Sequence, residues 1–370
     1  MSRRVVLAPD SFKGTVAAAD AAAAIARGWR SVAPDDDLVE RPMADGGEGT
    51  LDAFAAAVPA AERVPLTVTG PDGRPVDTAW LRLPDGTAVV ELASTSGLML
   101  LDPLRPLDAH TVGFGEAIGA AIDAGCERLL LALGGSSSTD GGTGALTALG
   151  ARFRDALGRP TAPGNRGLGE LRTVDLSTLR RPPAGGARVL GDVTNPLLGD
   201  AGAAAVFGPQ KGADAATVRL LEANLRRFVD VLAAVDGTDA VALADAPGAG
   251  AAGGTGFGLL VWGARMAGGA AAVADAIGLD RALADADLVV TGEGRYDGQS
   301  AAGKAPTEVA ARAAAAGVPV ALIAGSVDAD ASAFAAAQSL TQLAGSPAVA
   351  MAEPIRWLES AGAQLARSLR

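Results

Sequence analysis

The chain has 370 residues, of which 31 are Lys or Arg and 42 are Asp or Glu, and its formal net charge of −11 argues against a nucleic-acid partner, whose phosphates need a basic surface. It contains one His, one Cys and one Tyr (His110, Cys126 and Tyr296), too few for a zinc site of His and Cys ligands, an internal disulfide or CxxC redox chemistry. Any Ser-His-Asp or Cys-His device would depend on His110 alone, so the chemistry must rest on carboxylates, Lys, Arg, hydroxyls and backbone amides.

The N-terminal part predicts alternating strands and helices. Residues 4–8 (RVVLA) are typical of a buried strand, and residues 15–29 form an Ala-rich helical pattern with Thr15 as its candidate N-cap. Residues 38–41 predict a second strand and residues 48–57 a second helix. Strands separated by helices indicate a parallel sheet.

The middle of the chain has a different pattern. Residues 65–92 alternate apolar and polar side chains between Pro-Asp-Gly turns, which favours an antiparallel hairpin or meander. The elements predicted next are a helix at 114–124, a strand at 128–133, a helix at 143–149, a strand at 188–192 and a long amphipathic helix at 215–235.

Strand and helix alternate again near the end, with strands predicted at 286–291 and 319–324 and helices at 305–316 and 355–368. A single core rarely grows beyond roughly 250–300 residues, so the length favours two domains. We expect an α/β fold in which residues 1–64 and 286–370 form one parallel-sheet domain. A second, mixed α/β domain at 65–285 interrupts it.

Two apolar stretches bear on location. The run after Arg3 and Arg4 is too short for the apolar core of a signal peptide. Residues 246–264 have the length of a membrane span, but their Gly, Ala and Pro content indicates a buried loop and helix. We therefore expect a soluble, cytoplasmic protein without a membrane partner.

Charged residues and glycines gather in loops that follow predicted strands. In open parallel sheets, ligands bind outside the carboxyl ends of the strands. Three such loops are residues 9–14 (PDSFKG), 43–50 (MADGGEGT) and 291–300 (TGEGRYDGQS). Gly and Asp also make ordinary turns, but three loops of this kind at one sheet edge favour a site.

The inserted domain has a matching loop at residues 134–144 (GGSSSTDGGTG). Small residues let the backbone approach a ligand, and successive N–H groups can cradle an anion. Asp192 stands at another predicted strand end, and Lys211 lies in a predicted turn. We expect structural roles for His110, as a helix cap, and for Cys126, as a small buried side chain.

Residues 298–305 (GQSAAGKA) approach a Walker A loop but lack its final hydroxyl, which excludes a P-loop NTPase and leaves Lys304 as a candidate phosphate contact. Carboxylates, Lys and Gly-rich anion cradles with almost no His fit phosphoryl transfer, in which the protein positions the reactants and neutralises charge. In that chemistry Asp or Glu holds Mg²⁺, and one Asp accepts the proton of the substrate hydroxyl.

The chain resembles the bacterial type-1 glycerate kinases over essentially its whole length. The matching stretches, in order, are APDSFKG (8–14), MADGGEGT (43–50), GGSSSTDGGTG (134–144), DVTNPLLG (192–199), VFGPQKGA (206–213), GAGAAGG (248–254) and TGEGRYDGQS with GKAP (291–300 and 303–306). Many relatives have S-A-T-N-D-G-G where this chain has residues 136–142, so Thr139 replaces an Asn and any contact specific to that Asn is in doubt.

The resemblance implies ATP- and Mg²⁺-dependent phosphorylation of D-glycerate at its 2-hydroxyl, giving 2-phosphoglycerate and ADP. It also implies a flavodoxin-like domain interrupted by a mixed α/β domain, with the active site in the cleft between them. The alternatives are transfer to the 3-hydroxyl, another small hydroxy acid as substrate, or a non-catalytic sensor of a sugar acid or nucleotide. The oligomeric state is not indicated.

The same resemblance suggests roles for individual residues. Asp45 is the expected general base, and Lys13 and Arg295 would neutralise charge on the phosphates or the glycerate carboxylate. Asp192 and Asp297 are expected to hold Mg²⁺, or to replace Asp45 as the base. The expected substrate- and phosphate-binding residues are Asp10, Ser11, Gly46, Gly47, Gly134, Gly135, Ser136, Ser137, Asp140, Glu293 and Lys304.

Overall fold

The computed structural model describes residues 2–12, 14–297 and 305–369. Contacts divide the chain into two compact units: the first unit holds 1–45, 52–59 and 268–370, and the second unit holds 46–51 and 60–267. The chain returns to the first unit at Gly268, whereas the sequence pattern places this boundary at residue 286. The reason is that α11 (Gly269–Ala276) and α12 (Leu279–Leu283) pack against α13 (Ala305–Ala316).

The first unit is built on a parallel sheet whose described strands have the order β13-β12-β11-β1-β2. Numbered within the unit this is 2-1-3-4-5 from the other edge, the strand order of flavodoxin-like sheets. The predicted α/β class is therefore confirmed. Its strands are β1 (Arg4–Pro9), β2 (Asp37–Glu40), β11 (Leu288–Tyr296), β12 (Val320–Val327) and β13 (Ala336–Ser339).

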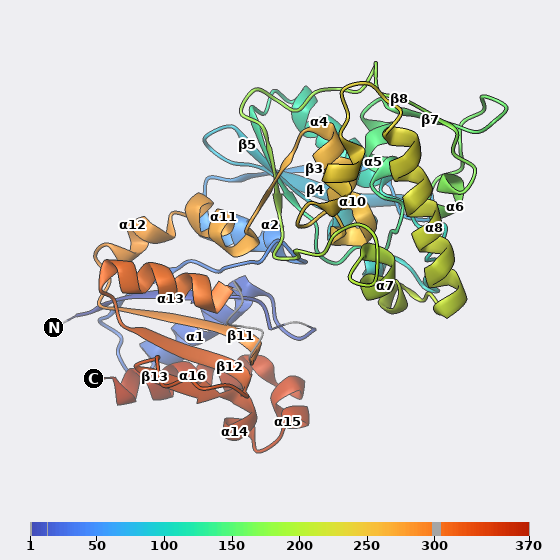
Figure 1. Ribbon diagram of the computed structural model, residues 1–370. Helices are drawn as coiled ribbons and strands as arrows, with labels where there is room; N and C mark the ends of the chain where they lie inside the picture. Colours follow the sequence, from blue (N-terminus) through green and yellow to red (C-terminus); the bar gives the residue numbers. More distant parts are fainter. Residues whose placement is uncertain (1, 13, 298–304, 370) are drawn as a thin grey trace. The chain divides into compact units, whose positions relative to one another are not determined.

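Helices cover both faces of this sheet (Figure 1). Val5 and Leu7 of β1 pack with α1 (Ala18–Arg30) and α16 (Pro354–Ser368), and α13 lies on the other face. The remaining helices of the unit are α14 (Leu340–Ala344), α15 (Pro347–Ala352) and, from Asp52 onward, α2 (Thr50–Ala57).

The second unit contains a mixed sheet of order β10-β9-β6-β5-β4-β3, in which β10, β9, β6 and β5 are parallel and β4 and β3 antiparallel. Its strands are β3 (Glu62–Thr69), β4 (Pro75–Arg82), β5 (Thr87–Glu91), β6 (Arg128–Ala132), β9 (Ala187–Leu190) and β10 (Arg265–Ala267), with β7 (Arg152–Arg154) and β8 (Thr173–Asp175) as a separate pair. The predicted meander at 65–92 is confirmed.

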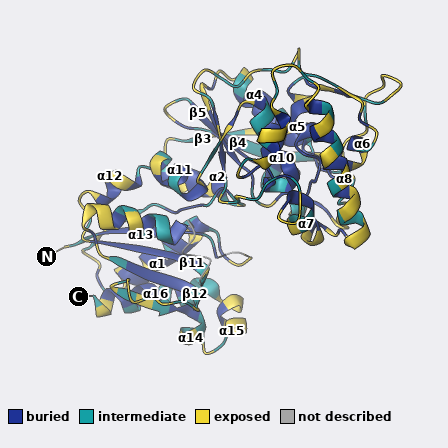
Figure 2. Cartoon of the chain, viewed as in Figure 1, coloured by how far each residue is buried: buried dark blue, intermediate teal, exposed yellow. Residues whose placement is uncertain are grey.

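The helices of the second unit are α3 (Ala93–Ser96), α4 (Val112–Asp123), α5 (Thr143–Ala148), α6 (Asn165–Leu168), α7 (Ala203–Phe207), α8 (Ala215–Leu232), α9 (Ala240–Asp245) and α10 (Ala251–Trp262), with 3₁₀ turns η1 (Leu98–Leu100) and η2 (Pro209–Lys211). Phe228 of α8 stacks edge-on against Phe153 and Phe257, with ring centroids 5.8 and 5.4 Å apart. Figure 2 shows buried strands inside each unit and exposed residues along the outer sides of helices such as α8 and α13.

Several predicted element boundaries differ from the structure, and two of the differences affect a predicted cap or site residue. The first helix begins at Ala18 rather than at residue 15, because the Thr15 hydroxyl donates back to the Phe12 carbonyl (2.7 Å) and forms a turn instead of a cap. β11 continues to Tyr296, so Glu293 and Arg295 lie in a strand and not in the predicted loop. Its ladder with β12 extends to the pair Tyr296–Val327.

The apolar run at 246–264 forms a turn followed by α10, as predicted, and α10 is mostly buried. Among the described residues, no helix is both long enough and apolar enough to cross a membrane.

Gly28 is the closest contact point between α1 and α16. A Cβ atom built on Gly28 would lie 1.9 Å from the Glu359 carbonyl oxygen. We expect Gly28→Ala to lower the free energy of unfolding by about 1–3 kcal/mol, because it forces two packed helices apart. Urea unfolding followed by circular dichroism measures the change.

Gly119 in α4 is the matched control. A Cβ atom there would contact only Arg180 Nη1 at 3.6 Å, an ordinary distance. Gly119→Ala should be neutral or stabilising by up to about 1 kcal/mol, because alanine favours the helix. Equal destabilisation by both substitutions would contradict the close contact between α1 and α16.

Candidate active site

The carboxyl ends of three parallel strands meet at one edge of the second sheet. Glu91 of β5, Ala132 of β6 and Leu190 of β9 are aligned in register there. The predicted loop 134–144 follows β6, and Asp192 follows β9. This edge is where ligands bind in open parallel sheets.

The predicted glycines of two loops touch each other at this edge. The Gly134 N–H donates to the Gly46 carbonyl (2.9 Å), and a Cβ atom on Gly134 would lie 2.3 Å from the Gly47 Cα. Gly46 has φ +89°, and a Cβ atom there would lie 2.5 Å from the Leu190 carbonyl oxygen. Gly135 has φ +74°. Glycine is needed here because the two backbones are in contact.

The serines of the loop are buried and their contacts differ. The Ser137 hydroxyl donates to the Ser96 carbonyl (2.8 Å). The Ser136 hydroxyl and the Ser138 carbonyl both accept hydrogen bonds from Lys211 Nζ, at 2.7 and 2.5 Å. The Ser138 hydroxyl has no hydrogen-bond partner among the described residues. The loop is thus fixed by its backbone and by one lysine.

Asp140 lies at the other end of the loop and is fully buried. One carboxylate oxygen accepts from the Thr111 N–H (2.9 Å), the Thr111 hydroxyl (2.8 Å) and the Gly144 N–H (3.1 Å). The other accepts from the Gly142 N–H (3.0 Å). These four donors come from its own unit, so the geometry favours a bracing role for this carboxylate. Its predicted contact with substrate stays untested.

A turn of left-handed backbone conformation packs against the loop at residues 134–144. Ala252, Gly253 and Gly254 all have positive φ and precede the regular part of α10. The Gly141 N–H donates to the Gly253 carbonyl (3.2 Å), and a Cβ atom on Gly253 would lie 2.1 Å from the Ser138 carbonyl oxygen. The motif GAGAAGG therefore serves close packing against the serine loop.

Two buried residues of this edge are missing from the predicted site. Lys211 is 2% exposed; its motif is evident in the sequence, but nothing local shows that its side chain reaches the serine loop. Glu91 is also buried, and its carboxylate accepts from the Leu51 N–H (3.0 Å) at the start of α2. Its only signal is an acidic residue ending an apolar strand.

In the first unit, β1, β2 and β11 bring predicted acidic residues to one sheet edge. Pro9 pairs with Gly292, so the buried Asp10 and Glu293 follow in register on neighbouring strands. One carboxylate oxygen of Asp10 accepts from the Ser11 N–H (2.6 Å). Asp45 is half-buried in the loop after β2.

Arg295 is paired with carboxylates of its own unit. Its Nε lies 2.8 Å from an oxygen of Asp328 and 3.4 Å from an oxygen of Asp297. The side chain is 66% exposed, so solvent screens these pairs. Asp328, which follows β12, is a further acidic residue that the sequence prediction omits. Lys13 and Lys304, two predicted phosphate contacts, lie outside the described residues.

The predicted residues thus belong to both units. Asp10, Ser11, Asp45, Glu293, Arg295 and Asp297 are in the first unit, and Gly46, Gly47, Gly134, Gly135, Ser136, Ser137, Asp140 and Asp192 are in the second. The described residues contain no group of three or more His, Cys, Asp or Glu side chains suited to a metal. That Asp192 or Asp297 holds Mg²⁺ stays a prediction, for an ion that commonly takes one or two carboxylates together with phosphates and water.

His110 and Cys126 have the expected structural positions. His110 is buried, and its Nδ1 accepts from the Val112 N–H (3.4 Å) at the start of α4. Burial lowers the pKa of His110, against the opposing charges of Asp140, Asp72 and Glu116. The neutral imidazole can then act as this acceptor. Cys126 is buried in the apolar core.

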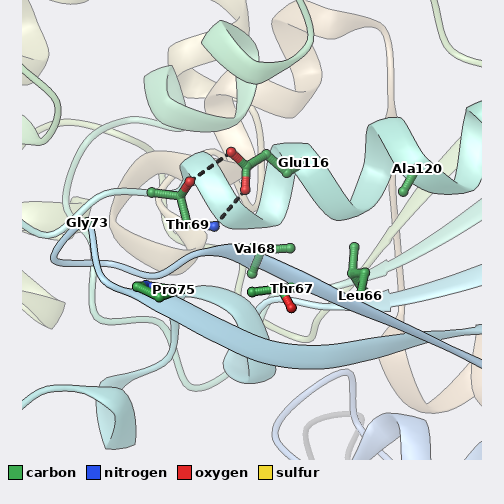
Figure 3. A pocket seen from close by; sticks show the side chains of 8 residues that line it. All are labelled: Leu66, Thr67, Val68, Thr69, Gly73, Pro75, Glu116 and Ala120. Atoms are coloured by element: carbon green, nitrogen blue, oxygen red, sulfur yellow. Dashed lines mark hydrogen bonds between the residues drawn. The ribbon is translucent and has the colours of Figure 1, made fainter.

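A surface depression of about 600 Å³ elsewhere on the second unit contains none of the predicted residues (Figure 3). It is lined mainly by β3 and α4. Its acidic residue, Glu116, accepts from the Thr69 N–H (2.6 Å) and the Thr69 hydroxyl (2.9 Å). With both of its oxygens bonded, Glu116 ties β3 to α4.

Known proteins resemble the chain over nearly its full length. The model of the glycerate kinase family matches residues 5–370. A glycerate kinase of Bacillus subtilis (strain 168) is 44% identical over 335 residues, covering 89% of this chain and 87% of the relative. A glycerate 2-kinase of Escherichia coli (strain K12) is 42% identical over 332 residues, covering 88% and 86%.

A solved structure agrees with these sequence matches. A crystal structure from Salmonella typhimurium LT2 with the provisional name glycerate kinase 2 has a TM-score of 0.86 and 39% sequence identity. The match covers 100% of this chain and 98% of that one.

Lys211 makes stability depend on pH. Burial lowers the pKa of Lys211 to about 7, and the charge of Asp140 opposes this shift. An unfolded lysine has a pKa of about 10.4. Between these values the unfolded chain binds more protons than the folded one, so stability due to this residue rises with pH. We expect wild type to gain stability over Lys211→Met between about pH 7 and about pH 9.

Urea unfolding of both proteins at several pH values measures this difference. Below about pH 6 the lysine is protonated in both states, so the difference should be constant there. A difference that stays constant from about pH 6 to about pH 9 would contradict the burial of the ammonium.

Proposed function

Because the chain belongs to the glycerate kinase family, we propose that it transfers the γ-phosphoryl group of ATP to the 2-hydroxyl of D-glycerate, giving 2-phosphoglycerate and ADP. The name of the Escherichia coli relative, glycerate 2-kinase, supports the 2-position. The structural observation that carries the proposal is the braced loop of small residues at the carboxyl ends of β5, β6 and β9, with buried serine hydroxyls at its centre.

In the proposed reaction, a glycerate oxygen forms a bond to the γ-phosphorus as the bond between that phosphorus and the bridging oxygen of ADP breaks. The hydroxyl proton passes to Asp45, the proposed general base, with Asp192 and Asp297 as the alternative bases. Ser136 and the glycine backbone of both loops would hold an anionic group, and Ser137 would join them only by giving up its bond to the Ser96 carbonyl. Such a reaction depends mainly on positioning and on neutralising charge.

The cationic part of the proposed site comes from Lys13, Arg295 and Lys304, with Asp10, Ser11 and Glu293 completing its wall. Arg295 already contacts Asp297 and Asp328, so a phosphate would compete with these carboxylates for the guanidinium.

We propose Mg²⁺ as the second cofactor, held by Asp192 or Asp297 together with the phosphates. When bound, the ion would neutralise charge on the phosphate oxygens. One or two carboxylates from the chain are enough for this role, because Mg²⁺ usually takes its remaining ligands from phosphates and water.

Glycerate and ATP are the proposed small-molecule partners, in the cytoplasm and without nucleic acid. The net charge of −11 supports this, because a chain with that balance repels polyanions while local cations still attract small ones.

The position of phosphorylation can be read from the product. Incubation with D-glycerate, ATP and Mg²⁺ should give ADP together with a product that enolase accepts directly, since 2-phosphoglycerate is its substrate. Spectrophotometric detection of phosphoenolpyruvate with enolase alone makes the measurement.

A product that enolase accepts only after addition of phosphoglycerate mutase would show transfer to the 3-hydroxyl. Absence of glycerate-dependent ADP release would contradict the kinase proposal and favour a sensor. Incubation without glycerate is the control for ATP hydrolysis.

The base assignment predicts a loss of turnover in Asp45→Asn. Removing a general base lowers kcat by about 10²–10⁴-fold, while the KM for ATP should change little. Asp192→Asn and Asp297→Asn are the matched variants, since they remove the alternative carboxylates. Near-normal kcat in Asp45→Asn beside a large loss in either of the others would transfer the base role to that residue.

A further inference from the structure

Lys211 is a buried cation whose role the proposed reaction does not yet include. It ends the 3₁₀ turn η2 between α7 and α8, where its own N–H donates to the Gly208 carbonyl (3.0 Å). Lysine is almost never fully buried without a partner, because removing an ammonium from water is costly. The contacts of this side chain must therefore offset the free-energy cost of its burial.

Lys211 does not neutralise Asp140 through a direct contact. The carboxylate of Asp140 is occupied by four donors from Thr111, Gly142 and Gly144. The ammonium of Lys211 instead donates to the Ser136 hydroxyl (2.7 Å) and to the Ser138 carbonyl (2.5 Å). It thus clamps alternate residues of the serine loop.

The bond to Ser136 has a chemical consequence. A hydroxyl has one proton and two lone pairs, and an ammonium can only donate. While it is protonated, at pH values below its pKa of about 7, Lys211 therefore occupies a lone pair of the Ser136 oxygen and leaves the hydroxyl proton to point elsewhere. Among the described residues, no acceptor receives that proton. Contact with a cation also makes the hydroxyl a stronger donor.

The two residues differ in access. Ser136 is 8% exposed and Lys211 is 2% exposed. The serine thus keeps some surface open to a ligand, whereas the lysine keeps almost none. We therefore expect an effect of the lysine on a ligand to pass through Ser136.

We propose that Lys211 is a positioning residue, whose ammonium turns the Ser136 hydroxyl proton toward an anionic oxygen of the bound substrates. This inference rests on the proposed function, and it specifies that the Ser136 hydroxyl donates its proton to the bound substrate. The acceptor is a carboxylate oxygen of glycerate or a phosphate oxygen of ATP, which present the same hydrogen-bond chemistry. Kinetics with each substrate varied in turn separate these two.

A double-mutant cycle in the full chain tests the proposal. Lys211→Met and Ser136→Ala should each lower kcat/KM by roughly tenfold to hundredfold, the range for a hydrogen bond to a charged group. The double variant should be no worse than the more affected single one, because both remove the same contact. A rise in KM for glycerate alone identifies the carboxylate, and a rise for ATP alone identifies the phosphate.

Ser137→Ala is the matched control, since the Ser137 hydroxyl donates to the Ser96 carbonyl and does not contact Lys211. Its fold-loss of kcat/KM should multiply with that of Lys211→Met in the double variant, because the two residues act independently. If the losses of kcat/KM in Lys211→Met and Ser136→Ala multiply in the double variant, the positioning proposal is overturned, although the proposed kinase function is not. If wild type itself shows no glycerate-dependent turnover, the proposed function fails and this inference with it.

Thermal unfolding of each variant separates lost function from lost fold. If Lys211→Met does not fold, Lys211→Gln replaces it in the cycle, because an amide keeps donors without the charge. Ser136→Ala alone also decides the question. Unchanged kcat/KM for both substrates in this variant overturns the proposal.

Discussion

The serine loop of the second unit is held between two buried charges of opposite sign, and the rest of the candidate site depends on it. Lys211 binds the loop at Ser136 and Ser138, and Asp140 gathers N–H groups and a hydroxyl from the following turn and from the start of α4. Each charge is costly to bury alone, but each is satisfied by groups of the loop that it holds. These contacts hold the loop in one conformation without a ligand, and such preorganisation reduces the ordering cost of binding.

Much of this arrangement follows from local sequence. Buried strands have dense β-branched or apolar runs, as in β1 and β6, and their carboxyl ends place the loops at the sheet edges. Gly46 and Gly134 were expected near a ligand, and their nearest neighbours in the structure are other backbone segments. The sequence shows that these positions hold glycine, but it does not show which backbone segments they contact.

The remaining features could not be predicted because they depend on residues distant in the chain. Lys211 meets Ser136 across 75 positions, and Glu91 meets Leu51 across 40. The end of β11 is set by β12, since the ladder continues as far as the partner strand does. Thr15 has the residue type of a cap, but its hydroxyl donates to the Phe12 carbonyl in a turn instead of accepting from a helix N–H, and residue type does not decide between these two bonds.

The pairing of β1 with β11 also has a consequence for biosynthesis. Val5 pairs with Leu288, so a central strand of the first unit receives one of its two neighbours only after the whole second unit has been translated. The second unit is nearly continuous in sequence and can form its sheet while the ribosome is still making β11. During that interval β2 can pair with one edge of β1. The edge that β11 will occupy stays open, with its backbone groups exposed to water and to any other nascent strand.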